Sequence, residues 1–132
     1  MAILAMEQFA WALADMGSDL VPCSSESEMR AALGRGAIPV WLPSEMALAD
    51  ADMPESWDMT SDSLSAWLAR RLGAERLILV KSAPAPHPLD PDLLAAHGLV
   101  DALFPRLISG AKLTLDWIAP GDEDRLESLL SQ

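Results

Sequence analysis

The chain has 132 residues, a formal net charge of −11 and a single cysteine. This length suits one domain, which we expect to span residues 1–132, and a hydrophobic share of 51% argues against disorder. The acidic balance argues against a nucleic-acid partner, which needs a basic patch, and one cysteine rules out an internal disulfide.

The first sixteen residues, MAILAMEQFAWALADM, predict a helix that is apolar on nearly every side. The segment is too short to span a bilayer, Glu7 and Gln8 interrupt it, and it lacks the basic start of a leader. We therefore expect no membrane partner and a cytoplasmic location. An apolar helix that begins without a cap is expected to be buried in a homo-oligomer or beneath a preceding segment that is missing.

Strands and helices then alternate along the chain. DLVPCSS predicts a strand, SESEMRAALGRG a helix capped by Ser25 and Glu28, and AIPVWLP a second strand. SEMALAD predicts one helical turn. The alternation predicts the α/β class, as a layered domain with a mainly parallel central sheet and helices on both faces.

The segment WDMTSDSLSAWLARRLGAERLILVKS predicts a helix that begins at Thr60 or Ser61 and ends at Gly73. RLILVKS then predicts a strand covered on both faces, because it is a continuous apolar run. A proline-rich loop, two short helices, the strand KLTLDWI and the helix DEDRLESLLSQ complete the chain. The helix that begins at Thr60 or Ser61 has an apolar stripe, which consists of Leu64, Trp67, Leu68 and Leu72.

Asp62 at the start of this helix and Lys81 at the end of the next strand are candidate site residues. A helix N-terminus presents unpaired N–H groups that suit phosphate, and ligands of open α/β sheets bind at the carboxyl ends of strands. The alternative is purely structural. Thr60 or Ser61 then only caps the helix, Asp62 complements the helix dipole, and Lys81 is solvated in a loop. The pattern of residues alone leaves both interpretations open.

The stretch TSDSLSAWLARRLGAERLILVKS resembles the second half of the amino acid kinase superfamily. In that family a Thr/Asn-x-Asp motif opens a helix of small residues, followed by Gly-Ala and a strand such as LLLLTK. The first sixteen residues and LVDALFPRLI are similar to segments of the branch that includes aminomethylfuran phosphate kinases.

This resemblance implies a carbamate kinase-like fold and ATP-dependent phosphoryl transfer to a small-molecule acceptor. It implies a catalytic role for Asp62, which would orient basic side chains, and nucleotide-binding roles for Thr60, Ser61 and Lys81. ATP and Mg²⁺ are the implied cofactors, with Mg²⁺ held mainly through phosphates.

The sequence also departs from the family pattern. It contains no Gly-Gly pair, and SAPAPHPLDP replaces the family's Asp-Gly after the nucleotide strand. We therefore expect the N-terminal part of such a kinase to be missing, and the activity of the chain alone stays open. The alternative function is a non-catalytic assembly or regulatory module that retains the kinase fold.

Overall fold

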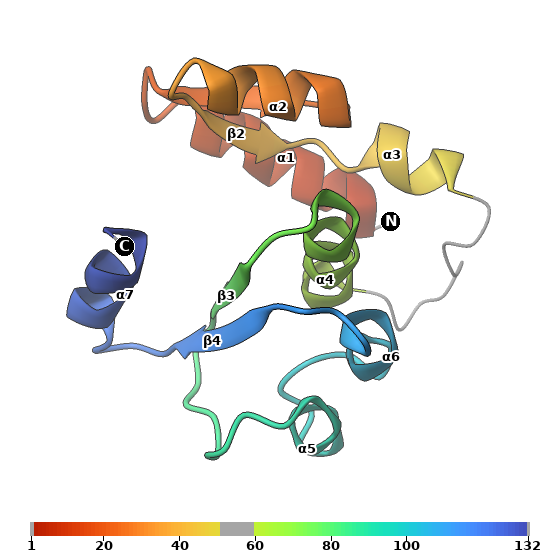
Figure 1. The fold of residues 1–132 in the computed structure, drawn as a ribbon, viewed down its shortest axis with the longest axis vertical. Coiled ribbons are helices and arrows are strands. Elements are labelled where there is room, and N and C mark those ends of the chain that lie inside the picture. Colours follow the sequence, from red (N-terminus) through yellow and green to blue (C-terminus); the bar gives the residue numbers. More distant parts are fainter. Residues whose placement is uncertain (1, 51–59, 132) are drawn as a thin grey trace. The chain divides into compact units, whose positions relative to one another are not determined.

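The computed structural model describes residues 2–50 and 60–131, and the chain divides into two compact units, Met1–Ser56 and Trp57–Gln132. Within the described ranges each unit contains a pair of parallel strands with helices packed on it (Figure 1). The predicted mixed α/β class is confirmed at this level, whereas the single domain over residues 1–132 stays a prediction. None of the described helices is long and apolar enough to cross a membrane.

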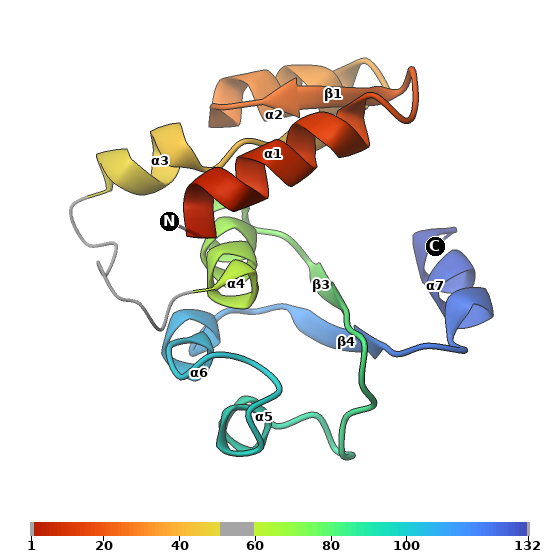
Figure 2. The same ribbon diagram turned by 180° about the vertical axis from the view of Figure 1, so that it is seen from behind.

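The first unit consists of α1 (Ala2–Ala14), β1 (Leu20–Cys23), α2 (Glu26–Gly34), β2 (Ile38–Trp41) and α3 (Ser44–Ala49). β1 and β2 pair in parallel, with Leu20 opposite Ile38 and Cys23 opposite Trp41. α1 and α2 pack on opposite faces of this strand pair (Figure 1 and Figure 2). The predicted strands and helices of this half are therefore confirmed.

Side-chain hydrogen bonds hold the starts of α2 and α3 in the first unit. The hydroxyl of Ser25 accepts a hydrogen bond from the backbone N–H of Glu28 at 3.2 Å, as predicted. The carboxylate of Glu28 accepts in turn from the N–H of Ser24 at 3.0 Å. Glu7, which interrupts the apolar run of α1, accepts from the N–H of Ser44 at 2.8 Å and so ties α1 to the start of α3.

The apolar side chains of α1 are mostly exposed. Ala10 is buried against Val40 and Leu42, but Phe9 is 81% exposed and Met16, just beyond the helix, is 80% exposed. The single chain therefore leaves this helix exposed, and its expected burial in a homo-oligomer stays a prediction. The helix packs on the strand pair with one stripe only, which leaves its other sides uncovered.

The second unit consists of α4 (Ser61–Leu72), β3 (Arg76–Val80), α5 (Pro91–Ala96), α6 (Phe104–Ile108), β4 (Thr114–Ile118) and α7 (Glu123–Leu130). β3 and β4 are parallel, with Leu79 opposite Trp117. Parallel strands need a crossover, and here the proline-rich loop, α5 and α6 supply it.

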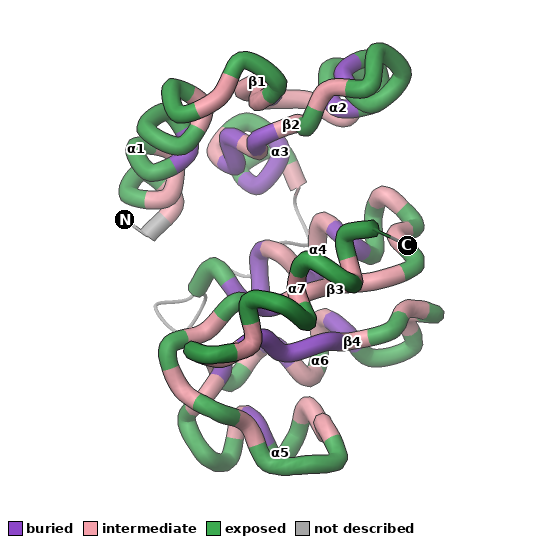
Figure 3. Tube along the Cα trace, turned by 90° about the vertical axis from the view of Figure 1, so that its left-hand side faces the viewer, coloured by how far each residue is buried: buried purple, intermediate pink, exposed green. Residues whose placement is uncertain are grey.

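The core of this unit lies on one face of the β3–β4 pair. Leu79 and Trp117 pack there with buried residues of α4, α5 and α6 and the loop before α6, namely Ala66, Leu94, Val100, Phe104 and Ile108. α7 contacts β4 but buries none of its own residues, and Figure 3 shows it largely exposed.

Two details of the second unit differ from the prediction. On α4 the buried positions include Ala66 and Ala69, whereas Trp67 of the predicted stripe is only half-buried. Leu64 of the predicted stripe is fully buried, as expected, and α4 contacts α6. β3 is not covered on both faces, because Val80 is 66% exposed and the helices pack mainly on the opposite face.

Candidate functional site

Asp62 and Lys81, which lie 19 positions apart in the sequence, meet in the structure. The Lys81 ammonium donates a hydrogen bond to Asp62 Oδ2 at 2.7 Å. α4 packs on β3, and this places the start of the helix beside the residue that follows the strand. The Asp62 and Lys81 side chains are 11% and 25% exposed, so the pair is shielded while the ammonium still reaches solvent.

The position of Lys81 is fixed from two further directions. Its backbone N–H donates to the carbonyl of Ile118 at 2.8 Å, which extends the pairing of the strands by one residue. Its ammonium lies 5.8 Å from the ring centroid of Trp117, within the range of a cation–π contact. The Trp117 indole is itself held by a 2.8 Å hydrogen bond to the carbonyl of Ala83.

Thr60 is the N-cap of α4. Its hydroxyl oxygen accepts from the backbone N–H of Asp62 at 3.3 Å, so the capping role allowed for Thr60 is confirmed. Ser61 is exposed in the first helical turn. Three residues were expected to bind nucleotide, and all lie next to Asp62. Lys81 contacts the Asp62 carboxylate, the Thr60 hydroxyl contacts the backbone N–H of Asp62, and Ser61 precedes Asp62 in the chain.

Asp101 completes this cluster and was not among the predicted site residues. Its carboxylate accepts from the backbone N–H and the hydroxyl of Thr60, at 2.9 and 2.6 Å, and from the hydroxyl of Ser63. It also accepts from the N–H groups of Leu103 and Phe104 at 2.9 and 3.1 Å. An aspartate shortly before a helix is a recognisable cap signal, but nothing local in the sequence indicates its partners on α4.

The hydrogen bonds around Asp101 determine its ionisation. Partial burial acts to raise its pKa, but donation from Ser63, Thr60 and the Leu103 N–H outweighs burial and lowers the pKa below the ordinary value of 3.8. Asp101 is therefore a carboxylate at neutral pH. Because its oxygens are engaged by five donors, it adds a stable negative charge at the start of α4.

This arrangement can engage one phosphate group through a limited set of atoms. An ammonium has three N–H donors, and Lys81 directs one of them to Asp62. The exposed hydroxyl of Ser61 lies in the first turn of the same helix, whereas the N–H and hydroxyl of Thr60 are bound to Asp101. Across residues 2–50 and 60–131 no three metal-ligating side chains gather, so Mg²⁺ bound here would take most ligands from phosphates and water.

A second charged cluster fastens α7 to β4. Asp116 lies 3.2 Å from the guanidinium of Arg76 and 3.3 Å from that of Arg125. Asp116 Oδ2 is buried without a well-oriented hydrogen bond, so its contact with Arg76 is an ion pair only. Arg125 also donates to the carbonyl of Trp117 at 2.8 Å, so the role of this cluster is structural.

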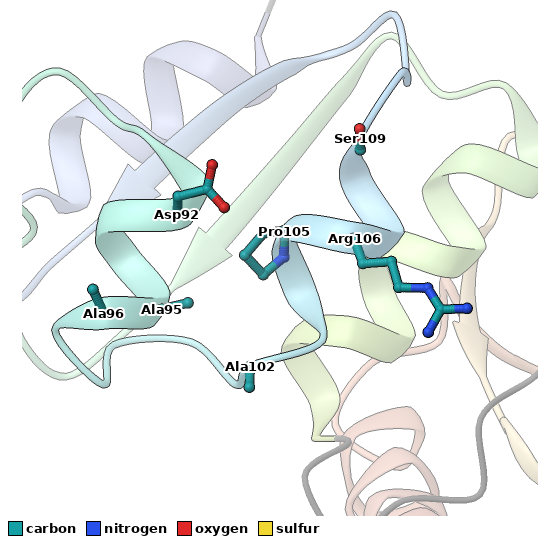
Figure 4. A pocket seen from close by; sticks show the side chains of 7 residues that line it. All are labelled: Asp92, Ala95, Ala96, Ala102, Pro105, Arg106 and Ser109. Atoms are coloured by element: carbon teal, nitrogen blue, oxygen red, sulfur yellow. The ribbon is translucent and has the colours of Figure 1, made fainter.

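An open hollow of about 650 Å³ lies between α5 and α6 (Figure 4), and neither Asp62 nor Lys81 lines it. Alanines and Pro105 form much of its wall. Asp92 on α5 and Arg106 on α6 are both exposed, and Arg106 extends away from α5. The hollow therefore brings no charged groups together and has no evident chemistry.

Cys23 lies in the first unit and is 1% exposed. Burial raises the pKa of its thiol, the nearby Glu28 raises it further, and Arg35 offsets part of this effect. A buried thiol with a raised pKa is a poor nucleophile, so Cys23 is a packing residue.

Asp62, Lys81, Thr60, Ser63 and Asp101 therefore form one connected cluster at the start of α4. Its function is inferred from these contacts and from the sequence pattern that carries them. No protein-family model matches the chain, and no curated protein matches it either.

Proposed function

We propose that the chain is the nucleotide-binding part of an ATP-dependent small-molecule kinase of the amino acid kinase family, with a carbamate kinase-like layered fold. The observation that supports this most strongly is the ion pair of 2.7 Å between Lys81 and Asp62 at the carboxyl end of β3. A cytoplasmic location and a homo-oligomeric state belong to the same proposal.

Phosphoryl transfer depends mainly on positioning and on neutralising the charge of the phosphates. In the proposed site Lys81 binds a phosphate oxygen, and Asp62 keeps the ammonium in one place. Thr60 caps the helix, and Ser61 offers its hydroxyl to the same phosphate. Mg²⁺ held by the nucleotide phosphates would reduce their repulsion from the carboxylates of Asp62 and Asp101, and a small molecule would accept the γ-phosphoryl group of ATP with release of ADP.

The chain has only two lysines, which provides a matched control. We expect calorimetric titration with Mg²⁺ and ADP to show binding that Lys81→Ala weakens roughly 10- to 100-fold, since a charge-assisted contact contributes about 1.5–3 kcal/mol. Lys112→Ala removes an exposed lysine outside the cluster and should leave the affinity unchanged. Equal affinities of the unaltered and Lys81→Ala chains would refute the proposed site.

One observation favours a second candidate, a non-catalytic assembly or regulatory module with the same fold. The exposed apolar side chains of α1, including Phe9 and Trp11, form a surface suited to self-association. Because a kinase can also be oligomeric, association does not separate the two functions. The ADP titration does, since the assembly module has no need to bind nucleotide through Lys81.

A further inference from the structure

We infer that Asp101 is a positioning residue for the proposed phosphate site, because it holds the start of α4 in the conformation that places Asp62 against Lys81. This inference rests on the proposed function. Asp101 itself does not contact Lys81, and it acts through the residues that flank Asp62.

A continuous path of hydrogen bonds connects Asp101 to Lys81. Asp101 binds the N–H and the hydroxyl of Thr60, and the Thr60 hydroxyl accepts from the N–H of Asp62. On the other side of Asp62, Ser63 donates its hydroxyl to Asp101. Asp62 thus lies between two residues that the same carboxylate holds, and its own carboxylate accepts from Lys81.

Asp101 also fixes this helix start to the rest of the second unit. Two of its donors, the N–H groups of Leu103 and Phe104, belong to the N-cap and the first residue of α6. Phe104 is fully buried in the core with Leu79 and Trp117. Asp101 therefore anchors the start of α4 to the same core that contains Trp117, the residue whose ring lies against the Lys81 ammonium.

The substitution Asp101→Asn tests this path while keeping the size of the side chain. A carboxylate accepts from all five donors, whereas an amide offers one acceptor oxygen and an NH₂ group that only donates. We expect the start of α4 to loosen and Asp62 to lose its fixed position. If Asp101 were only the cap of α6, the variant would lose stability but the Asp62–Lys81 pair would be unaffected.

The first readout is the NMR signal of the Lys81 ammonium, which requires no nucleotide. Lys112→Arg leaves a single lysine signal, and both the Asp62 contact and the Trp117 ring determine its shift. Asp101→Asn should move this signal toward that of Asp62→Asn, and Ser63→Ala, a milder change, should move it less in the same direction. The control is Asp90→Asn, which makes the same substitution at the N-cap of α5, outside the cluster, and should leave the signal in place.

The second readout is affinity for Mg²⁺ and ADP. We expect Asp101→Asn to weaken binding about tenfold, because a displaced ammonium no longer meets the phosphate. In the Lys81→Ala background the same change should cost nothing further, because Asp101 acts through Lys81.

Each outcome distinguishes the two proposals. A Lys81 signal that is unchanged in both Asp101→Asn and Ser63→Ala overturns the positioning role, as does an affinity loss that adds fully to that of Lys81→Ala. If the unaltered chain binds no ADP but its Lys81 signal responds to Asp101→Asn, the proposed function is overturned and the dependence of the ion pair on Asp101 is supported.

Discussion

Removing the charge of Lys81 should destabilise the second unit by about 1–3 kcal/mol. Lys81→Met keeps an unbranched apolar stem near Trp117 and leaves the shielded Asp62 carboxylate without its cation. Exposed ion pairs contribute about 0–1 kcal/mol, whereas removing one partner of a buried pair costs about 3–5 kcal/mol. The exposures of 25% for Lys81 and 11% for Asp62 place this pair between those limits.

A double-mutant cycle separates the pair from other effects of the substitution. Asp62→Asn alone leaves the ammonium unpaired, and the double variant Asp62→Asn with Lys81→Met removes both charges. We expect the double variant to be more stable than the sum of the single changes predicts, by about 1 kcal/mol or more. Lys112→Met is the control and should change the unfolding free energy by less than about 0.5 kcal/mol.

The assay is urea unfolding followed at a probe within the second unit, because the chain divides into two compact units. The indole N–H of Trp117, which is bonded to Ala83, provides that probe by NMR. Additive losses in Lys81→Met and Asp62→Asn would show that the two side chains do not interact. That result would refute both the ion pair and the phosphate site built on it.

The remaining predictions concern acid stability and association. Partial burial acts to raise the pKa of Asp101, but its hydrogen bonds outweigh burial and lower the pKa below 3.8. The ionised carboxylate therefore contributes its full stability above pH 3.8, and this contribution is lost as the pH falls through the lowered folded-state pKa. The difference in unfolding free energy between the unaltered chain and Asp101→Asn should therefore shrink below pH 3.8; a difference that stays constant with pH would contradict this. Phe9, 81% exposed on α1, should promote self-association at micromolar concentration. Light scattering should show Phe9→Gln shifted toward monomer, and a clean monomer of the unaltered chain would contradict the prediction.

Local chemistry explains which parts of the fold could be predicted from the sequence. Ser25 and Glu28 form their cap within a few residues, and Thr60 caps α4 in the same way. Gly73 ends that helix with a φ of 68°, a left-handed conformation that glycine adopts without strain. Signals of this kind need no knowledge of the tertiary structure, so the helices and strands follow from the residues.

Burial could not be predicted as well, because it depends on which elements pack together. The apolar side chains of α1 predict a helix that needs cover, but Phe9 and Met16 are exposed in the single chain, so its burial in an oligomer stays a prediction. The apolar run of β3 promises cover on both faces, yet Val80 is exposed beside the buried Leu79. A hydrophobic pattern reports what a segment can bury, and the packing of the other elements decides which of its faces is covered.

The candidate site shows the same division between local and distant information. Asp62 and Lys81 could be placed at one edge of the sheet in advance, because helix starts and the carboxyl ends of strands meet there in α/β folds. That Asp62 orients a basic side chain was implied only by the family resemblance. Asp101 could not be placed there in advance, because 41 and 38 positions separate it from Thr60 and Ser63. Its presence changes the interpretation of the polar segment: Thr60 and Ser63 are bound to a carboxylate, which leaves Lys81 and Ser61 for phosphate. A nucleotide site here therefore depends on the single ammonium that Asp62 holds, and for that reason Lys81 and Asp101 are the residues at which the proposal is most sharply tested.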